Sequence, residues 1–233
     1  MTFIVMAIKT GVSLAGAFLL QETLPAKERT QSTTIQTILG LRKVAKNPNF
    51  SSLLLVGAFI SAPFMAYLAL ASYIYIDGFG VSETTFSMYF ALNAGASILG
   101  PVMYMRFGAG SVKKVISAGI MVAIISAILI LTIGNASPII FLLSYVLYSI
   151  MTSYFRPLIS DLLLSATKTD VGATSSVMNF GFTVIGSIGM VVGSLQWSSY
   201  TGGLGITMLI FIALTMIVWL YLLKAKSIRF DWK

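Results

Sequence analysis

Few side chains in this sequence could do chemistry, and the missing types exclude most reaction classes. The chain has no His and no Cys, so the usual general base near neutral pH, the thiolate nucleophile and the commonest zinc ligands are all absent. No two carboxylates fall at helical spacing inside a segment apolar enough to span a membrane. The sequence therefore predicts no enzyme, no metal site and no bound cofactor.

The ionisable residues beside apolar runs are the first candidates for function, because charge is costly to bury in lipid. Arg156 stands directly before Pro157, and Asp161 follows four residues later. The proline would remove a backbone hydrogen bond and bend a helix. Arg156 could then contact a substrate, and Asp161 is the candidate for proton coupling. The alternative is that both side chains extend to the membrane interface.

Polar and aromatic residues inside apolar runs form a second group of candidates. Asn93 and Asn179 could each hydrogen-bond a substrate in a central cavity, or bridge two helices. Tyr67 and its aromatic and methionine neighbours could line a pocket for a bulky apolar ligand. Tyr73 and Tyr75 lie nearer the end of the same run, where an aromatic belt at the membrane interface is the commoner explanation.

The elements that must position these residues are membrane-spanning helices. Of 233 residues, 57% are hydrophobic and 9% charged, and the mean hydropathy is +0.92, whereas a soluble domain carries about 25% charged residues. A span needs about 20 apolar residues, and clusters of turn residues at 134–138 and 198–203 divide the two longest uncharged runs. Six spans are predicted at 51–76, 84–105, 114–133, 138–160, 172–197 and 205–223.

The first 21 residues are predicted to form a seventh span. A signal peptide would carry positive charge ahead of its apolar core, but here eight mostly apolar residues precede Lys9. The net charge of +8 would suggest nucleic acid in a soluble protein. Loop by loop, however, 14 of the 15 basic residues fall on one face, as the positive-inside rule requires. The partner is then the lipid bilayer and no nucleic acid, with the N-terminus outside and the C-terminus in the cytoplasm.

Proline and glycine mark where these helices bend and pack. Pro63 and Pro157 interrupt two spans, as expected where helices line a pathway. Gly189 and Gly193 form a pair of small residues four apart, which lets two helix backbones approach closely. Ala96 and Gly100 form another such pair.

The order of several short motifs resembles a transporter of the major facilitator superfamily. Residues 22–25 (ETLP), between a span and a basic loop, resemble the join between the two halves of such a transporter. Residues 66–72, 79–82 and 86–93 are similar to the bicyclomycin-resistance (Bcr/CflA) branch of drug exporters. Pro157 followed by residues 172–176 (GATSS) resembles the pattern of the tenth and eleventh spans.

The connection after the span 84–105 resembles the cytoplasmic-loop motif of the same superfamily. The matching residues are Arg106, Gly108, Lys113 and Lys114. Met105 stands where an acidic residue is common, which argues against a charge relay in this loop. Tyr73 also departs from the branch, which usually has proline at that position.

The resemblance implies an all-α integral membrane fold that corresponds to the sixth to twelfth of twelve spans. Residues 1–21 would be the sixth span, 22–50 a cytoplasmic central loop, 51–223 a six-helix C-terminal bundle and 224–233 a cytoplasmic tail. The implied function is drug:proton antiport of small, drug-like compounds across the inner (plasma) membrane by alternating access. The implied partner is an N-terminal six-span half. The alternative is a stand-alone seven-span sensor or receptor.

Overall fold

The computed structural model of the chain describes residues 2–19, 34–108, 111–166 and 171–224. Every regular element in these ranges is a helix, which confirms the predicted all-α class. Two compact units divide the chain, residues 1–38 and 39–233. Residues 22–25, the first part of the predicted central loop and residues 225–233 of the predicted tail lie outside the described ranges.

The predicted first span is a helix, but a short one. Helix α1, Thr2–Ala17, has 16 residues and is therefore roughly 24 Å long at 1.5 Å per residue. The hydrocarbon core of a bilayer is about 30 Å thick. The described helix is thus apolar but shorter than a complete crossing. Helix α2, Thr34–Ala45, falls in the predicted central loop and has Arg42 and Lys43 in its last turn.

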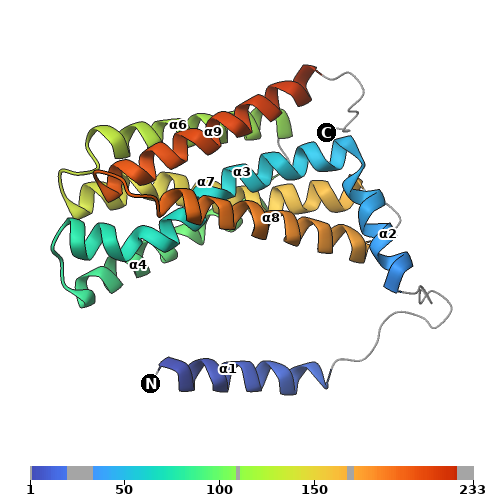
Figure 1. Cartoon of the computed structure of the whole chain (residues 1–233), viewed down its shortest axis with the longest axis horizontal. Coiled ribbons are helices and arrows are strands. Elements are labelled where there is room, and N and C mark those ends of the chain that lie inside the picture. Colours follow the sequence, from blue (N-terminus) through green and yellow to red (C-terminus); the bar gives the residue numbers. More distant parts are fainter. Residues whose placement is uncertain (1, 20–33, 109–110, 167–170, 225–233) are drawn as a thin grey trace. The chain divides into compact units, whose positions relative to one another are not determined.

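The six remaining predicted spans are confirmed as helices long and apolar enough to cross a membrane (Figure 1). They are α3 (Pro48–Ser72) continued by the π-helix η1 (Tyr73–Gly78), α4 (Glu83–Ser97) continued by α5 (Leu99–Phe107), α6 (Val112–Thr132), α7 (Pro138–Ala166), α8 (Val171–Gly193) and α9 (Tyr200–Lys224). The last helix begins five residues earlier than predicted. Ser199 accepts hydrogen bonds from the backbone N–H groups of Gly202 and Gly203, so these glycines continue the helix.

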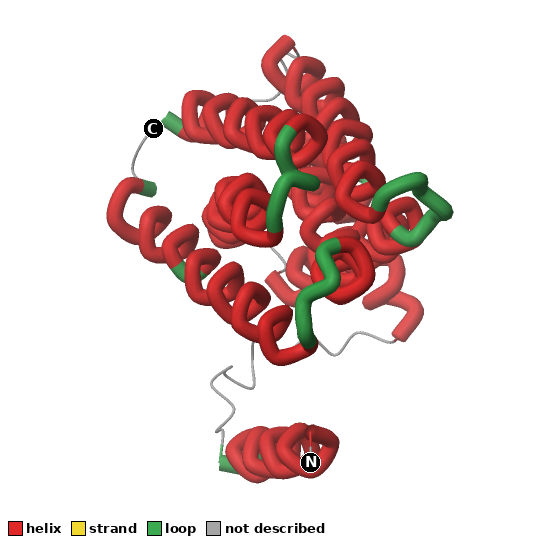
Figure 2. The backbone as a smooth tube through the Cα atoms, turned by 90° about the vertical axis from the view of Figure 1, so that its left-hand side faces the viewer, coloured by secondary structure: helices red, strands yellow, loops and turns green. Residues whose placement is uncertain are grey.

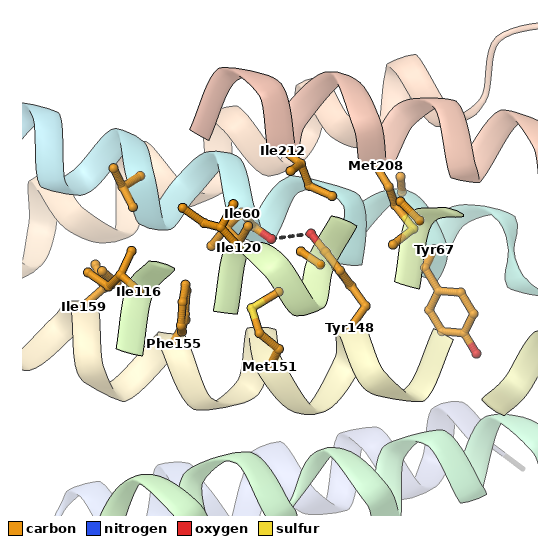
Figure 3. Close-up of a cluster of buried hydrophobic side chains, with 14 of the residues drawn as sticks. Ile60, Tyr67, Ile116, Ile120, Tyr148, Met151, Phe155, Ile159, Met208 and Ile212 are labelled. Atoms are coloured by element: carbon orange, nitrogen blue, oxygen red, sulfur yellow. Dashed lines mark hydrogen bonds between the residues drawn. The ribbon is translucent and has the colours of Figure 1, made fainter. Parts of the chain in front are cut away.

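The other four spans pack around α3 and α7. Helix α3 contacts α7, α8 and α9, and α7 also contacts α4, α5 and α6. In the α3 span 67% of the most apolar stretch is buried, against 11% in the α4–α5 span and 22% in α8. Figure 3 shows the core where α3, α6, α7 and α9 meet. Much of α4, α5 and α8 therefore forms the surface of the bundle.

Three prolines lie inside the spans. Pro63 lies within α3 and Pro157 within α7, as the sequence predicts. The predicted span 84–105 carried no break, but the structure divides it at Ile98. Pro101 has no N–H to donate to the carbonyl of Ser97, which explains why α4 ends there.

Glycines allow close contact between helices at two places. A Cβ on Gly189 would lie 2.8 Å from the carbonyl carbon of Ala62, and one on Gly193 would lie 2.9 Å from Ala66 Cβ. The structure thus places both glycines directly against α3. Gly100 of α5 lies equally close to the backbone of α7, where an added Cβ would be 2.5 Å from the carbonyl oxygen of Ile150.

Candidate functional site

The structure separates the predicted pathway residues into three places. Tyr67 and Asn93 are buried on α3 and α4, both of which contact α7. Arg156 and Asn179 lie on the exposed surface of α7 and α8. Asp161 is exposed near the end of α7 and faces α5. No single cavity unites the five residues in the described part of the chain.

Tyr67 belongs to a buried group of rings, called here the aromatic cluster. Its ring stacks on Tyr145 with centroids 4.0 Å apart, and Phe90 and Phe141 follow at 6.1 and 6.4 Å. Side chains therefore fill the space around Tyr67 in this conformation. The cluster comprises Tyr67, Tyr75, Tyr89, Phe90, Phe141 and Tyr145.

Tyr73 and Tyr75, both of which could belong to an aromatic belt at the membrane interface, differ in burial. Tyr75 is fully buried, while Tyr73 is 50% exposed. Tyr75 stacks on Tyr89 of α4 with centroids 5.2 Å apart and meets Phe141 of α7 edge-on at 5.4 Å. Tyr75 is therefore a packing residue and not part of a surface belt. The alternation of exposed and buried residues along η1 could not be predicted, because a π-helix departs from the usual helical period.

Polar atoms without partners are buried beside the aromatic cluster. Within the described residues, Asn93 Oδ1, the Tyr145 hydroxyl and Ser149 Oγ have no hydrogen-bond partner. Each buried polar group without a hydrogen-bond partner destabilises the fold by about 1–3 kcal/mol. By contrast, the buried Tyr148 hydroxyl donates to the carbonyl oxygen of Ile60 and so joins α7 to α3 (Figure 3). The α4–α7 contact therefore has unused polar capacity, which a ligand, water or another conformation could satisfy.

Arg156 and Asn179 lie at the same depth on two adjacent helices. The Arg156 guanidinium is 5.8 Å from the centroid of the Phe182 ring on α8, and Asn179 precedes Phe182 by one helical turn. Arg156 is nine residues before Ser165, and Asn179 is eight residues after Val171. At 1.5 Å per residue each lies roughly 12–14 Å from the same end of its span. Both polar side chains therefore lie more than two helical turns in from that end.

Asn179 begins a row of exposed polar side chains on α8, called here the polar ladder. It comprises Asn179, Thr183 and Ser187, at intervals of four residues. Each donates to the backbone carbonyl four residues earlier, at 3.0, 2.8 and 2.9 Å. These bonds satisfy the hydroxyl groups. The amide oxygen of Asn179 and the charge of Arg156 are more costly on a surface in contact with lipid. Sequence analysis missed Thr183 and Ser187, although their spacing from Asn179 is visible there.

Asp161 lies four residues after Pro157 on α7 and links this helix to α5. Its Oδ2 accepts a hydrogen bond of 3.1 Å from the Tyr104 hydroxyl. The Tyr104 ring also meets Tyr154 of α7 edge-on, with centroids 5.7 Å apart. Tyr104 was not predicted as a functional residue, because no pattern in the sequence links it to a carboxylate 57 positions away. Among the described residues, no three His, Cys, Asp or Glu side chains lie together as possible ligands of a metal ion.

The residues of the predicted cytoplasmic-loop motif flank the connection between α5 and α6, with Arg106 in the last turn of α5 and Lys113 and Lys114 in the first turn of α6. Arg106, Lys113 and Lys114 are exposed. Gly108 ends α5, and its N–H donates to the carbonyl of Tyr104 at 2.7 Å. A side chain on Gly108 would collide with that same carbonyl. The glycine therefore allows a sharp end to α5 and leaves the three cations at one end of the bundle.

Comparison with known proteins supports a transporter relationship. The chain is 30% identical over 118 residues to the "Uncharacterized MFS-type transporter YdgK" of Bacillus subtilis (strain 168). This stretch is 50% of the chain and 29% of the relative's length, so the chain spans only part of the protein it resembles. No family model matches the chain. The protein is therefore a multi-pass membrane protein, distantly related to an MFS-type (major facilitator superfamily) transporter.

Proposed function

We propose that this chain forms the C-terminal six-helix wall of a drug exporter in the Bcr/CflA branch of the major facilitator superfamily. The transporter would exchange small organic compounds for protons by alternating access. One observation carries the proposal: Arg156, Asn179 and the rest of the polar ladder lie on an exposed face of helices that are otherwise apolar enough to span a membrane.

The cost of burying charge in lipid supports this reading of the exposed face. Estimates for an arginine at mid-membrane begin at about 2.5 kcal/mol. Because Arg156 and Asn179 sit at equal depth, the α7–α8 face is better suited to water or protein than to lipid. A second bundle facing it would enclose a central pathway, as in transporters built from two halves. The partner in this proposal is an N-terminal six-span half.

The individual residues take the following roles in the proposal. Arg156 and Asn179 contact the substrate, and Asp161, coupled to Tyr104, exchanges the proton. Tyr67 and Asn93 act when the helices rearrange, because both are buried in the present conformation. The loop cations hold the connection between α5 and α6 at the cytoplasmic surface, which places the N-terminus outside and the C-terminus inside the plasma membrane.

Ethidium efflux from a host that lacks its own exporters tests this function. The chain is expressed alone, and also together with the six-span N-terminal bundle of a related exporter. We expect efflux only from the pair, because one wall cannot form a pathway with two alternating openings. In the pair, Arg156→Ala and Asn179→Ala should reduce efflux, while Ile217→Ala, at an exposed apolar position of α9, should not. Drug resistance conferred by the chain alone would contradict the proposal.

A further inference from the structure

Two adjoining cavities open at the end of the bundle where η1 lies. The first has a volume of about 370 Å³ and is lined by Tyr73, Gln196, Trp197 and Tyr200, among others. The second, of about 390 Å³, is lined by Phe79, Asn135, Ser199 and Tyr200. Figure 2 looks onto this end, where loops drawn in green connect the helices. Since Tyr200 lines both cavities, they adjoin. Each is within the volume range of small-molecule sites, about 300–1,000 Å³.

Three aromatic side chains line the first cavity, and two of them present large exposed areas. Tyr73 is 50% exposed and Tyr200 41% exposed, and their ring centroids are 5.6 Å apart with a tilt of 34°. Trp197 is held in place, because its Nε1 donates to the carbonyl of Val192 at 3.1 Å. Its only polar group is therefore already bonded, so the indole can offer the cavity little besides its ring.

The π-helix explains why Tyr73 reaches this surface. Helix α3 is the most buried of the spans, but within η1 both Tyr73 and Asp77 are exposed while Ile74 and Tyr75 remain inside. π-helical segments are rare and occur frequently at functional sites. Here the segment brings an aromatic ring and a carboxylate to the same end of the bundle.

The charges at this end are negative. The connections between α3 and α4, α6 and α7, and α8 and α9 all lie here, and each is completely described. Asp77 and Glu83 are the charged residues in and beside these connections, which contain no Lys or Arg. The faces of Tyr and Trp rings attract cations, and the two carboxylates give this end of the bundle the same preference for positive charge. An anionic ligand would find no basic partner here.

We propose that the cavity formed by Tyr73, Trp197 and Tyr200 binds a quaternary or primary ammonium group. This inference goes beyond the transport function, because the cavity lies at the opposite end of the spans from Arg156. The same chemistry is offered by a soluble cation such as choline and by the ammonium headgroup of phosphatidylethanolamine. Tyrosine and tryptophan rings that serve only as a membrane-interface belt would not discriminate charge.

Choline binding to the purified full chain tests the proposal. The protein is placed in nanodiscs of phosphatidylglycerol, which carries no ammonium group, and titrated with radiolabelled choline. The uncharged isostere 3,3-dimethyl-1-butanol serves as the competing control. We expect saturable choline binding that the alcohol displaces at least tenfold less well than unlabelled choline does. No saturable binding, or equal displacement by the alcohol, would overturn the proposal.

Variants of the rings locate the site. One cation–π contact contributes about 0.5–2 kcal/mol, so Tyr73→Leu and Tyr200→Leu should each weaken choline binding roughly 2- to 30-fold. Tyr73→Phe retains the ring and should bind nearly as wild type. Tyr221→Leu is the matched control, because Tyr221 is 59% exposed on α9 but near its opposite end. If Tyr221→Leu weakens binding as much as Tyr73→Leu, or if neither cavity variant weakens it, the site is wrong.

Nanodiscs containing phosphatidylethanolamine distinguish the two sources of the ammonium group. A lipid headgroup in the cavity would weaken choline binding in these nanodiscs, and Tyr73→Leu would abolish that competition. Unchanged choline affinity would identify a soluble cation as the ligand. Thermal unfolding of each variant, compared with wild type, shows that the cavity variants are folded.

Discussion

The contact between α5 and α7 can be tested by one added methyl group. Gly100→Ala would place a Cβ 2.5 Å from the carbonyl oxygen of Ile150, 2.6 Å from the backbone nitrogen of Tyr154 and 2.8 Å from the carbonyl carbon of Ser153. All three atoms belong to the backbone of α7, so no side chain can move aside to relieve the contact. The same turn of α7 precedes Pro157, which has no N–H for the Ser153 carbonyl.

The magnitude follows from these distances. Non-bonded carbon atoms pack best at about 3.5–4.0 Å, so the two helices must separate by close to 1 Å. Overpacking of this kind costs about 1–3 kcal/mol, and the better helix propensity of Ala returns up to about 1 kcal/mol. We therefore expect Gly100→Ala to lower the free energy of unfolding by about 1–2 kcal/mol. At about 2–4 °C per kcal/mol for a chain of this size, Tm should fall by about 2–8 °C.

Gly95→Ala in the same span is the matched control. No atom lies within 4 Å of a Cβ at Gly95, so the variant gains helix propensity without a clash and should raise Tm. Both variants are purified in the same detergent, and unfolding is followed by tryptophan fluorescence, since the chain has three tryptophans. A Gly100→Ala protein as stable as Gly95→Ala would refute the close backbone contact between α5 and α7.

Four further substitutions test the polar groups. Tyr148→Phe removes the buried hydrogen bond to the Ile60 carbonyl and should lower the free energy of unfolding, measured by a denaturant titration, by about 1–3 kcal/mol. Wild-type stability would show that the hydrogen bond contributes nothing. Ser149→Ala removes a buried hydroxyl without a partner among the described residues, so the free energy of unfolding should stay the same or rise. Ser126→Ala breaks a 2.6 Å hydrogen bond to the Ser144 carbonyl and should lower the free energy of unfolding by about 0.5–1.5 kcal/mol. The reverse order of stabilities would contradict these hydrogen-bond assignments. Asp161→Asn retains an acceptor for the Tyr104 hydroxyl but cannot exchange a proton. The Tm should therefore stay within error of wild type, while efflux by the paired halves should lose its response to a pH gradient. An unchanged response would exclude Asp161 as the coupling group.

The six spans could be predicted from the sequence because a span is recognised by its length and hydropathy, and neither property depends on which helices pack beside it. Pro63 and Pro157 were found for the same reason, since a proline lacks its N–H wherever it stands. The break at Ile98 follows from Pro101 and was within reach of the same argument. Local chemistry was thus sufficient for the elements.

The faces of the helices could not be predicted from the sequence. In a membrane both the protein core and the lipid are apolar, so hydrophobic residues do not indicate which side of a span is buried. Tyr75 therefore could not be distinguished from Tyr73, and the burial of Asn93 could not be distinguished from the exposure of Asn179. The pairing of Tyr104 with Asp161 depends on how α5 crosses α7, which only the three-dimensional arrangement shows.

Aqueous accessibility of the polar ladder tests the central claim most directly. Because the chain has no Cys, Thr183→Cys and Ser187→Cys each create a single thiol for reaction with a membrane-impermeant, water-soluble maleimide. Ile217→Cys is the control, since Ile217 is 63% exposed on α9 but belongs to an apolar surface. If the α7–α8 face lines a water-filled pathway, both ladder cysteines react in intact membranes and the Ile217 cysteine does not. Ladder cysteines that stay as unreactive as the one at 217 would place this face against lipid and contradict the account.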